Sequence, residues 1–250
     1  SNNAYFNLFQ EAGDGRANRE NIIARLYGVS FENNIIGTPV QRYYEGGSIV
    51  PTQNFVDNYL MADGLPITKS PLYRAPDASM THAEYFKGKD PRMGFTLFKR
   101  GDEFITGGNY TAPNPSLQRS GFGIRKYSNR EFWARQTSFI DKPVLRYAEV
   151  LLNYAEAKVE LNEIDQSVYN AINAVRQRSS VEMPPITGGK SQEDLRYIIR
   201  KERKYEFAAE GLRFFDIRRW KIAHEVMPGK LLGRVRNDFL ETAPTIDKNG

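Results

Sequence analysis

The sequence feature that most constrains the fold is a run of apolar and small residues, three and four positions apart, in the later half of the chain. The residues with this spacing are Leu145, Ala148, Leu152, Ala155 and Val159. Because an α-helix turns once every 3.6 residues, these side chains share one face. The spacing therefore predicts an amphipathic helix over about 144–161, and the alanines on its apolar face allow close packing against a second helix.

Local signals predict where this helix begins and ends, and where the next one starts. Asp141–Pro143 precedes the periodic run and predicts the start of the helix, since proline is favoured in a first turn. Asn162 can end it, and Asp165 or Ser167 can cap a second helix. That helix carries Val168, Ile172, Val175 and Arg178. The two together form an αα-hairpin of about 34 residues, the length of a tetratricopeptide unit.

A second helix pair follows a linker rich in proline and glycine. Ser191 and Asp194 form a variant of the capping box, with Asp in place of the usual Glu or Gln. The helix that they open carries Leu195, Ile198, Ile199, Glu202, Tyr205 and Ala209. Gly211 predicts the end of this helix, because glycine readily adopts the left-handed conformation beyond a helix C-terminus. A final helix is expected over about 212–223.

The part of the chain before these helices has a different character. Residues 1–140 contain frequent glycine, proline, asparagine and aspartate, which are typical of turns and loops. Short helices are expected at Thr52–Met61, with Thr52 as the N-cap, and at roughly 80–87. We therefore expect one mainly α-helical domain with few short strands, in which residues 1–140 form long irregular loops and residues 141–250 form the helices.

Composition excludes several classes of protein. The chain has no cysteine, which rules out disulfides and thiolate chemistry within it. Its 35 Lys and Arg residues are interspersed with 30 Asp and Glu residues, so the net charge of +5 does not predict nucleic-acid binding. Neither histidine lies in a metal-binding motif. No metal, cofactor or catalytic residue is expected, and no apolar run is long enough to span a bilayer.

The basic run Arg200–Lys204 has two interpretations. Such a run can bind nucleic acid. On a helix, however, Arg203 faces Glu206, Glu210 can face Arg213, and Asp216 lies three residues from both Arg213 and Arg219. The sequence favours the second interpretation, an ion-paired pair of helices.

Aromatic residues in the loops are the candidate binding residues. An aromatic ring offers a flat apolar face with which the C–H face of a sugar can stack, while arginine, asparagine and aspartate can hydrogen-bond its hydroxyl groups. The candidates are Tyr43, Tyr44, Tyr73, Tyr110 and Trp133. The alternative for each is that its ring packs against the underside of a long loop.

Several motifs, in order along the chain, resemble those of the SusD/RagB family of outer-membrane nutrient-binding lipoproteins. Two early ones are Pro51–Asp57, followed by Tyr59, and Asp63–Pro66; a third is Lys89–Arg92, which contains an Asp-Pro-Arg sequence. The later ones are Arg146–Ala157, Ala171–Arg176 and Ile199–Arg203 through Trp220. Each motif is moderately specific, whereas their order and spacing together are specific.

The resemblance implies a fold with tetratricopeptide-like helix pairs and a long irregular insertion that helps form the ligand face. It implies a lipoprotein on the outer surface of the cell, which captures glycans without cleaving them and passes them to a TonB-dependent transporter of the SusC type. The lipid anchor would lie outside this chain, because the chain has no cysteine to carry it. The family's signal, first repeats and closing tail are not found, so we expect the later half of a SusD-like protein.

Two other functions remain open. The helical half could be a scaffold that binds a protein or peptide partner, with the loop aromatics serving only as packing. A glycan-cleaving enzyme is the third alternative, since 30 acidic residues leave room for a catalytic pair although no motif indicates one.

Overall fold

The computed structural model describes residues 3–15, 18–28, 49–75, 80–104, 108–110, 120–128 and 138–233. Over these ranges the fold is mainly helical, as predicted, with one two-stranded sheet. No helix in the described part of the chain has both the length and the apolar character needed to cross a membrane.

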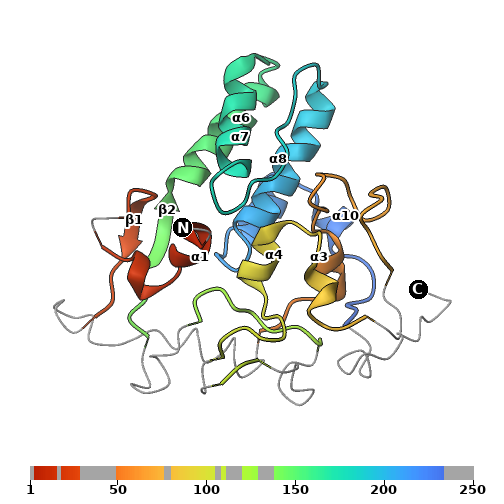
Figure 1. Cartoon of the computed structure of the whole chain (residues 1–250). Coiled ribbons are helices and arrows are strands. Elements are labelled where there is room, and N and C mark those ends of the chain that lie inside the picture. Colours follow the sequence, from red (N-terminus) through yellow and green to blue (C-terminus); the bar gives the residue numbers. More distant parts are fainter. Residues whose placement is uncertain are drawn as a thin grey trace.

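Three long helices form the upper part of the molecule, and shorter elements lie below them (Figure 1). The long helices are α6 (Tyr147–Glu160), α7 (Gln166–Arg176) and α8 (Gln192–Glu206). The short helices are α1 (Ala4–Asn7), α3 (Gln53–Asp57), α4 (Pro91–Thr96), α9 (Arg213–Arg219) and α10 (Ala223–Val226). The described ranges also contain 3₁₀ turns at Glu11–Gly13 and Glu84–Phe86. Strands β1 (Asn21–Arg25) and β2 (Lys142–Arg146) pair antiparallel.

The helices α6 and α7 form the predicted hairpin, and α8 packs against both. The predicted apolar face of α6 is buried from Ala148 to Val159. It meets α7 and α8 in a core formed by Ala155, Val159, Val168, Tyr169, Ala171, Ile172, Leu195 and Ile199. The predicted caps are also confirmed: the Asp165 side chain accepts a hydrogen bond from the backbone of Ser167, and Ser191 forms a complete capping box with Asp194.

The predicted start of α6 is wrong. The segment Lys142–Arg146, which contains Pro143, is strand β2 rather than a first helical turn. It pairs with β1, and the backbone N–H of Tyr147 donates to the carbonyl oxygen of Glu20 at 2.8 Å, so the helix begins only at Tyr147. The partner strand lies more than a hundred residues earlier, which is why the local sequence pattern did not reveal the pairing.

Two further helix ends differ from the prediction. The helix α8 ends at Glu206, before the predicted stop at Gly211, and the intervening turn carries Glu210 toward the protein interior. The final helix expected over 212–223 is divided into α9 and α10, because Lys221 has a left-handed backbone with φ of 58°.

The two early helices are shorter than predicted. Thr52 caps α3 as expected, accepting a hydrogen bond from the backbone N–H of Phe55 at 3.2 Å. That helix ends at Asp57 rather than Met61. The helix expected at 80–87 is only the 3₁₀ turn Glu84–Phe86.

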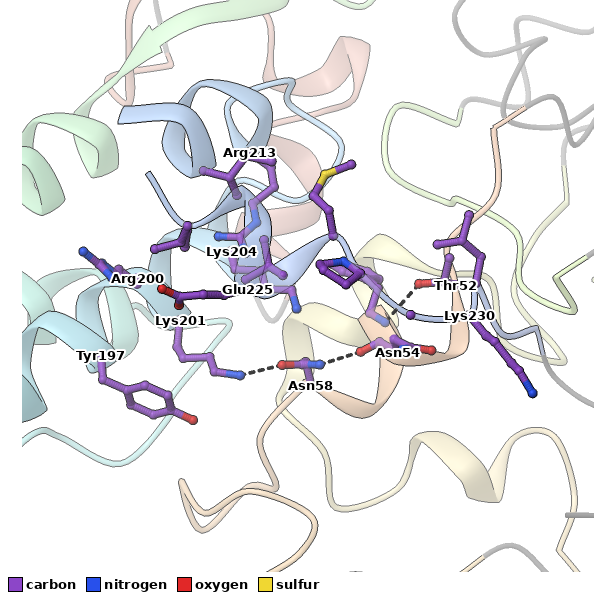
Figure 2. Close-up of a pocket in the computed structure, with 18 residues that line it drawn as sticks. Thr52, Asn54, Asn58, Tyr197, Arg200, Lys201, Lys204, Arg213, Glu225 and Lys230 are labelled. Carbon is purple, nitrogen blue, oxygen red and sulfur yellow. Dashed lines mark hydrogen bonds between the residues drawn. The ribbon is translucent and has the colours of Figure 1, made fainter. Parts of the chain in front are cut away.

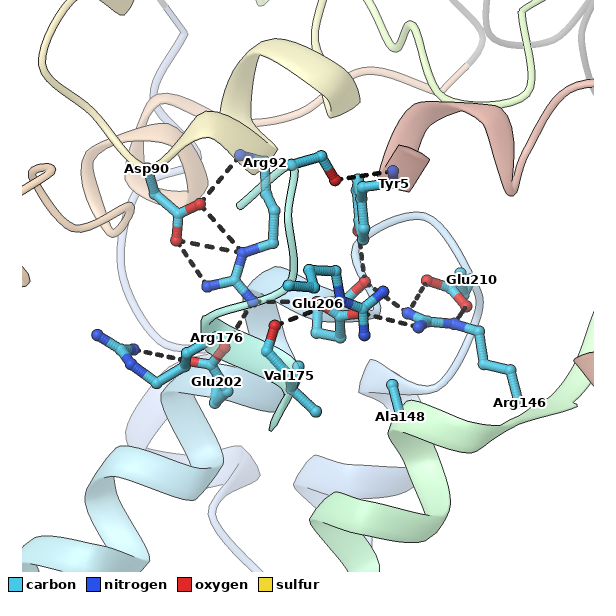
Figure 3. Close-up of polar contacts among 12 residues, drawn as sticks. Tyr5, Asp90, Arg92, Arg146, Ala148, Val175, Arg176, Glu202, Glu206 and Glu210 are labelled. Carbon is cyan, nitrogen blue, oxygen red and sulfur yellow. Dashed lines mark hydrogen bonds and ion pairs between the residues drawn. The ribbon is translucent and has the colours of Figure 1, made fainter. Parts of the chain in front are cut away.

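A network of buried charges joins the early, loop-rich part of the chain to α8 (Figure 3). Arg92, at the start of α4, has no solvent-exposed side-chain surface. Its guanidinium donates to Asp90 at 2.7 Å, to Glu202 at 2.6 Å and to Glu206 at 3.0 Å. Glu202 also accepts from Arg176 of α7 at 2.7 Å. Arg92 therefore joins α4 to α8, and Glu202 extends the network to α7.

A second arginine, Arg146, continues the network at the end of β2. Its guanidinium donates to Glu206 at 2.7 Å and to both carboxylate oxygens of Glu210 at 2.8 Å. Lys126, which is fully buried, donates to the same Glu210 at 2.6 Å. Burial alone would raise the pKa of Glu206, but Arg178, Arg146 and Arg92 outweigh it and hold that pKa well below its usual range.

Charges within this network balance among the described residues. Its cations are Arg92, Lys126, Arg146, Arg176 and Arg178. Its anions are Glu20, Asp90, Glu202, Glu206 and Glu210. Five positive and five negative groups lie together, which is the condition under which charges can remain buried.

The ion pairs predicted within the last helices are only partly correct. The pair of Asp216 and Arg219 forms at 2.9 Å as expected. Arg203, however, pairs with Asp216 of α9 at 2.9 Å instead of with Glu206, because Glu206 faces the interior network. Glu210 joins Arg146 rather than Arg213 for the same reason.

Removing Arg92 is expected to destabilise the protein strongly. The change Arg92→Ala leaves Asp90 buried without its cation and takes from Glu202 one of its two arginine partners, which costs about 3–5 kcal/mol. The matched control is Arg196→Ala, which breaks a pair with Glu160 whose side chains are 31% and 44% exposed and should cost under ~1 kcal/mol. Urea unfolding followed by circular dichroism measures both changes. Equal costs for the two variants would contradict the structural role of the network.

Candidate functional site

A cleft of about 640 Å³ opens where α3, α8, α9 and α10 meet the segment 227–231 (Figure 2). This volume lies within the range of roughly 300–1,000 Å³ that small-molecule sites occupy. The backbone N–H of Gln53 donates to the carbonyl oxygen of Leu232 at 2.7 Å, which holds the segment after α10 against α3. The cleft is thus built from α3, in the first part of the chain, and from the last described helices and the segment that follows them.

The helix α8 contributes two different faces to the fold. Its inward face carries Glu202, Arg203 and Glu206, all buried and all ion-paired. Another face lines the cleft with Tyr197, Arg200, Lys201 and Lys204. These four residues are three, four and seven positions apart, the spacing of one helix face. The basic run is therefore divided between a structural side and an open side.

Positive charge predominates in the cleft. The cationic side chains that line it are Arg200, Lys201, Lys204, Arg213 and Lys230. The described lining contains one carboxylate, that of Glu225. Lys201 donates to the neutral side-chain oxygen of Asn58, and the Nε atom of Arg200 is buried without a hydrogen-bond partner in the described part of the chain. Unlike the buried cations, these five form no ion pair with a carboxylate of the described ranges, although Asp216 attracts Arg213 and Glu160 attracts Arg200.

Aromatic rings take the place of carboxylates beside several of these cations. The Lys204 Nζ atom lies 5.9 Å from the ring centroid of Phe55, and the Lys201 Nζ atom lies 5.4 Å from that of Tyr197. The guanidinium of Arg200 lies 5.1 Å from the ring centroid of Trp220. Cation–π contacts are favourable but leave the positive charge in place. The ring of Tyr197, at 59% exposed, remains available to a ligand.

The neighbouring positive charges in the cleft affect the pKa of Lys204. Burial, and then the positive charges of Lys201 and Arg213, lower that pKa to about 7. Burial and Arg213 also lower the pKa of Lys201. The surroundings of Lys204 therefore disfavour a further positive charge, and an anion in the cleft would reverse that effect.

The side chains of the described lining are suited to hydrogen-bonding a ligand. Lysine and arginine side chains donate hydrogen bonds to hydroxyl and anionic oxygens, and asparagines can donate and accept. Glycoside hydrolysis ordinarily uses two carboxyl groups, whereas the described lining offers only Glu225. Among the described residues, no three His, Asp or Glu side chains gather in a group that could hold a metal ion.

The loop aromatics predicted as binding residues fall into two groups. Tyr43, Tyr44 and Trp133 lie outside the described residues. Tyr73 is half-buried, and its ring centroid lies 5.6 Å from the Nζ atom of Lys89. Burial, followed by the negative charge of Asp57, raises the pKa of Tyr73.

Tyr110 does not occupy the exposed position that the prediction requires. It is 3% exposed and stacks on Phe98 at a centroid distance of 5.0 Å, with Phe104 at 5.3 Å. Its ring therefore packs within a loop, the alternative that the sequence left open. The structure does not bring Tyr73 and Tyr110 into one cluster.

The sequence interpretation missed the residues that line the cleft. Arg200 and Lys204 were assigned to an ion-paired surface, yet their spacing from Tyr197 already places the three on one helix face. No carboxylate occurs three or four positions before Lys204 or after it on α8, where only Arg200, Lys201 and the adjoining turn are found. This lack of a carboxylate at helical spacing from Lys204 was the signal in the sequence that could have revealed the basic side of the helix. The part played by α3 and by the segment 227–231 could not be inferred from local sequence.

Comparison with known proteins identifies the relatives of this chain. The model of the SusD family matches residues 14–238. A SusD-like carbohydrate-binding protein of Bacteroides fragilis is 35% identical, with a TM-score of 0.71 over 89% of this chain. A second SusD-like protein of that organism is 27% identical, with a TM-score of 0.67 over 89% of this chain.

The chain spans less than half the length of these relatives. It covers 45% and 47% of the two Bacteroides fragilis chains. A SusD-like protein of Formosa agariphila, named P2, is 42% identical over 110 residues, which are 42% of this chain and 20% of that protein.

Lys204 is expected to titrate near neutral pH. Side-chain NMR of the lysines should show a midpoint of about 7 for Lys204, because burial and neighbouring cations disfavour its charged form. The change Lys201→Met removes one of these cations and should raise the midpoint. Lys158→Met is the matched control, since Lys158 lies on α6 and pairs with Asp165. A Lys204 midpoint near the ordinary lysine value of roughly 10.4 would refute the crowding of positive charge.

Proposed function

Because the chain belongs to the SusD family, we propose that it captures oligosaccharides or polysaccharides at the cell surface without cleaving them. The family match over residues 14–238 is the observation that carries this proposal. The relative with 35% identity is a carbohydrate-binding protein, which supports the same ligand class. The cleft beside α8 provides a site of suitable size for one or a few sugar units.

The cleft can hold a sugar by two complementary contacts. The exposed ring of Tyr197 offers a face for the C–H groups of a sugar ring. The side chains of Asn54 and Asn58, and the neighbouring cations, can hydrogen-bond its hydroxyl groups. Tyr73, together with Tyr43, Tyr44 and Trp133, is retained in the proposal as a set of further ring platforms on the loops.

The proposed partner is a TonB-dependent transporter of the SusC type, to which the bound glycan is passed. The protein would be held at the outer membrane by a lipid anchor outside this chain. This part of the proposal rests on what membership of the family implies.

An exposed apolar stripe on α6 favours a second function, the binding of a protein partner. Tyr147, Val150 and Tyr154 lie three and four positions apart on this helix face, and Leu161, the residue directly after α6, lies seven positions after Tyr154. They are between 40% and 69% exposed. Exposed apolar surface of this kind is typical of protein interfaces. The two functions are compatible if α6 contacts a partner while the cleft and loops hold sugar.

Removing the ring of Tyr197 is expected to weaken glycan binding about fivefold, since one aromatic stacking contact contributes ~1 kcal/mol. Calorimetry of the full-length protein against a panel of polysaccharides measures this change for Tyr197→Ala. Tyr154→Ala, which removes an exposed tyrosine from α6, is the control and should bind normally. Release of cleaved products from the panel, or no binding to any glycan, would contradict the proposal.

A charge placed on the apolar stripe is expected to impair partner binding. The double change Val150→Glu and Tyr154→Glu should reduce co-purification of the transporter at least tenfold, because it puts carboxylates into an apolar contact. Ala174→Glu on α7 adds the same type of charge at another exposed helix position and should have no effect. Unchanged co-purification of the double variant would exclude α6 as the contact surface.

A further inference from the structure

The cleft beside α8 differs from the rest of the described protein in how its cations are compensated. In the interior network, each arginine and the lysine contact at least one carboxylate, and the charges balance. In the cleft, five cations share the described lining with Glu225 alone. The two arrangements occur on opposite sides of the same helix. This contrast calls for a ligand that supplies negative charge.

The cations come from several elements rather than from one. Arg200, Lys201 and Lys204 lie on α8, Arg213 on α9 and Lys230 in the segment after α10, and all five line the cleft, with Arg200 and Lys230 at its opposite edges (Figure 2). Arg200, Lys201, Lys204 and Arg213 are each at least partly buried. Partly buried cations interact more strongly with an anion than solvated ones do, because solvent screens them less.

The rest of the lining favours a sugar over a small free anion. The cleft holds about 640 Å³, far more than one sulfate or carboxylate requires. Phe55 and Tyr197 add ring faces, while Asn54 and Asn58 add neutral hydrogen-bonding groups. Rings suit the apolar face of a sugar, amides suit its hydroxyls, and cations suit an acidic substituent.

We propose that this cleft selects acidic saccharides, in which a carboxylate or a sulfate ester contacts the cations of α8 and α9 while the sugar ring lies against Tyr197. This inference rests on the proposed function, since it specifies the class of glycan that the site takes. The shared chemistry is an anionic oxygen group carried on a sugar.

The affinity of the cleft for an acidic saccharide should change with pH in a direction that the charge of Lys204 determines. The charged groups that line the cleft with Lys204 are Arg200 and Lys201 on its own helix, Arg213 on α9, Glu225 on α10 and Lys230 beyond it, and the neutral Phe55 of α3 lies beside the Lys204 Nζ atom. With a pKa of about 7, Lys204 loses its charge as pH rises from 6 to 9. Affinity for an acidic saccharide should therefore fall over that range, whereas affinity for an uncharged one should stay constant.

The test is calorimetry of the full-length protein with three oligosaccharides of equal length: one of uronic acids, one carrying sulfate esters and one uncharged. The wild-type protein should bind an acidic oligosaccharide at least tenfold more tightly than the uncharged one, and added salt should reduce that difference. Comparing the uronate with the sulfated chain shows which anionic group the cleft takes. The affinity of the variant Lys201→Met/Lys204→Met for the acidic oligosaccharide should be at least tenfold lower than that of the wild-type protein. Its affinity for the uncharged oligosaccharide should change little. Lys221→Met, an exposed cation outside the cleft lining, is the control.

The possible outcomes separate this inference from the proposed function. Binding of uncharged glycans as tight as that of acidic ones, unaffected by salt, would overturn acidic selectivity and leave glycan capture intact. Inorganic sulfate binding as tightly as the sulfated oligosaccharide, or binding only to vesicles of anionic lipid, would overturn the saccharide assignment. Binding of no glycan at all would overturn both proposals. If the double variant does not fold, the salt and pH dependence of the wild-type protein decides the question.

Discussion

The structure depends on the buried guanidinium of Arg92, which holds Asp90, Glu202 and Glu206 together. These carboxylates belong to segments more than a hundred residues apart, so the contact joins the loop-rich half of the chain to α8. Arg146 repeats the arrangement from the other side, through Glu206 and Glu210. Buried charges are tolerated only when they are paired and hydrogen-bonded, so each member fixes the position of the next.

This network also determines how α8 can function. Its carboxylates and Arg203 are used for structure on one side, which leaves Arg200, Lys201 and Lys204 on the other without carboxylate partners in the described ranges. A helix whose inward face is fixed by ion pairs presents its outward face in a defined geometry. Preorganised donors of this kind bind a ligand with little loss of conformational freedom. One face of α8 thus stabilises the fold, and the opposite face is the one proposed to bind a ligand.

The sequence predicted those parts of the fold that depend on neighbouring residues. The spacing from Ala148 to Val159 and the capping box at Ser191 are local signals, and both are confirmed. Strand β2 was mistaken for a helical turn because its partner, β1, lies far away in the chain. The partners of Glu206 also lie in other segments of the chain, at Arg92, Arg146 and Arg178. Local spacing assigned Arg203 to Glu206, whereas three arginines from other elements bind this carboxylate. The Asp-Pro-Arg sequence at Asp90 supported the family resemblance without revealing its contacts. The cleft was missed because four of the segments that line it lie outside α8.

The most direct test of the central claim is native-state amide hydrogen exchange of α4 and α8. If the ion network joins the two halves of the chain into one cooperative unit, the amides of Pro91–Thr96 that donate hydrogen bonds and those of Gln192–Glu206 should open with the same free energy, close to that of global unfolding. Opening of α4 at a clearly lower free energy, with α8 still protected, would show that the two halves are not held together by Arg92 and its carboxylates.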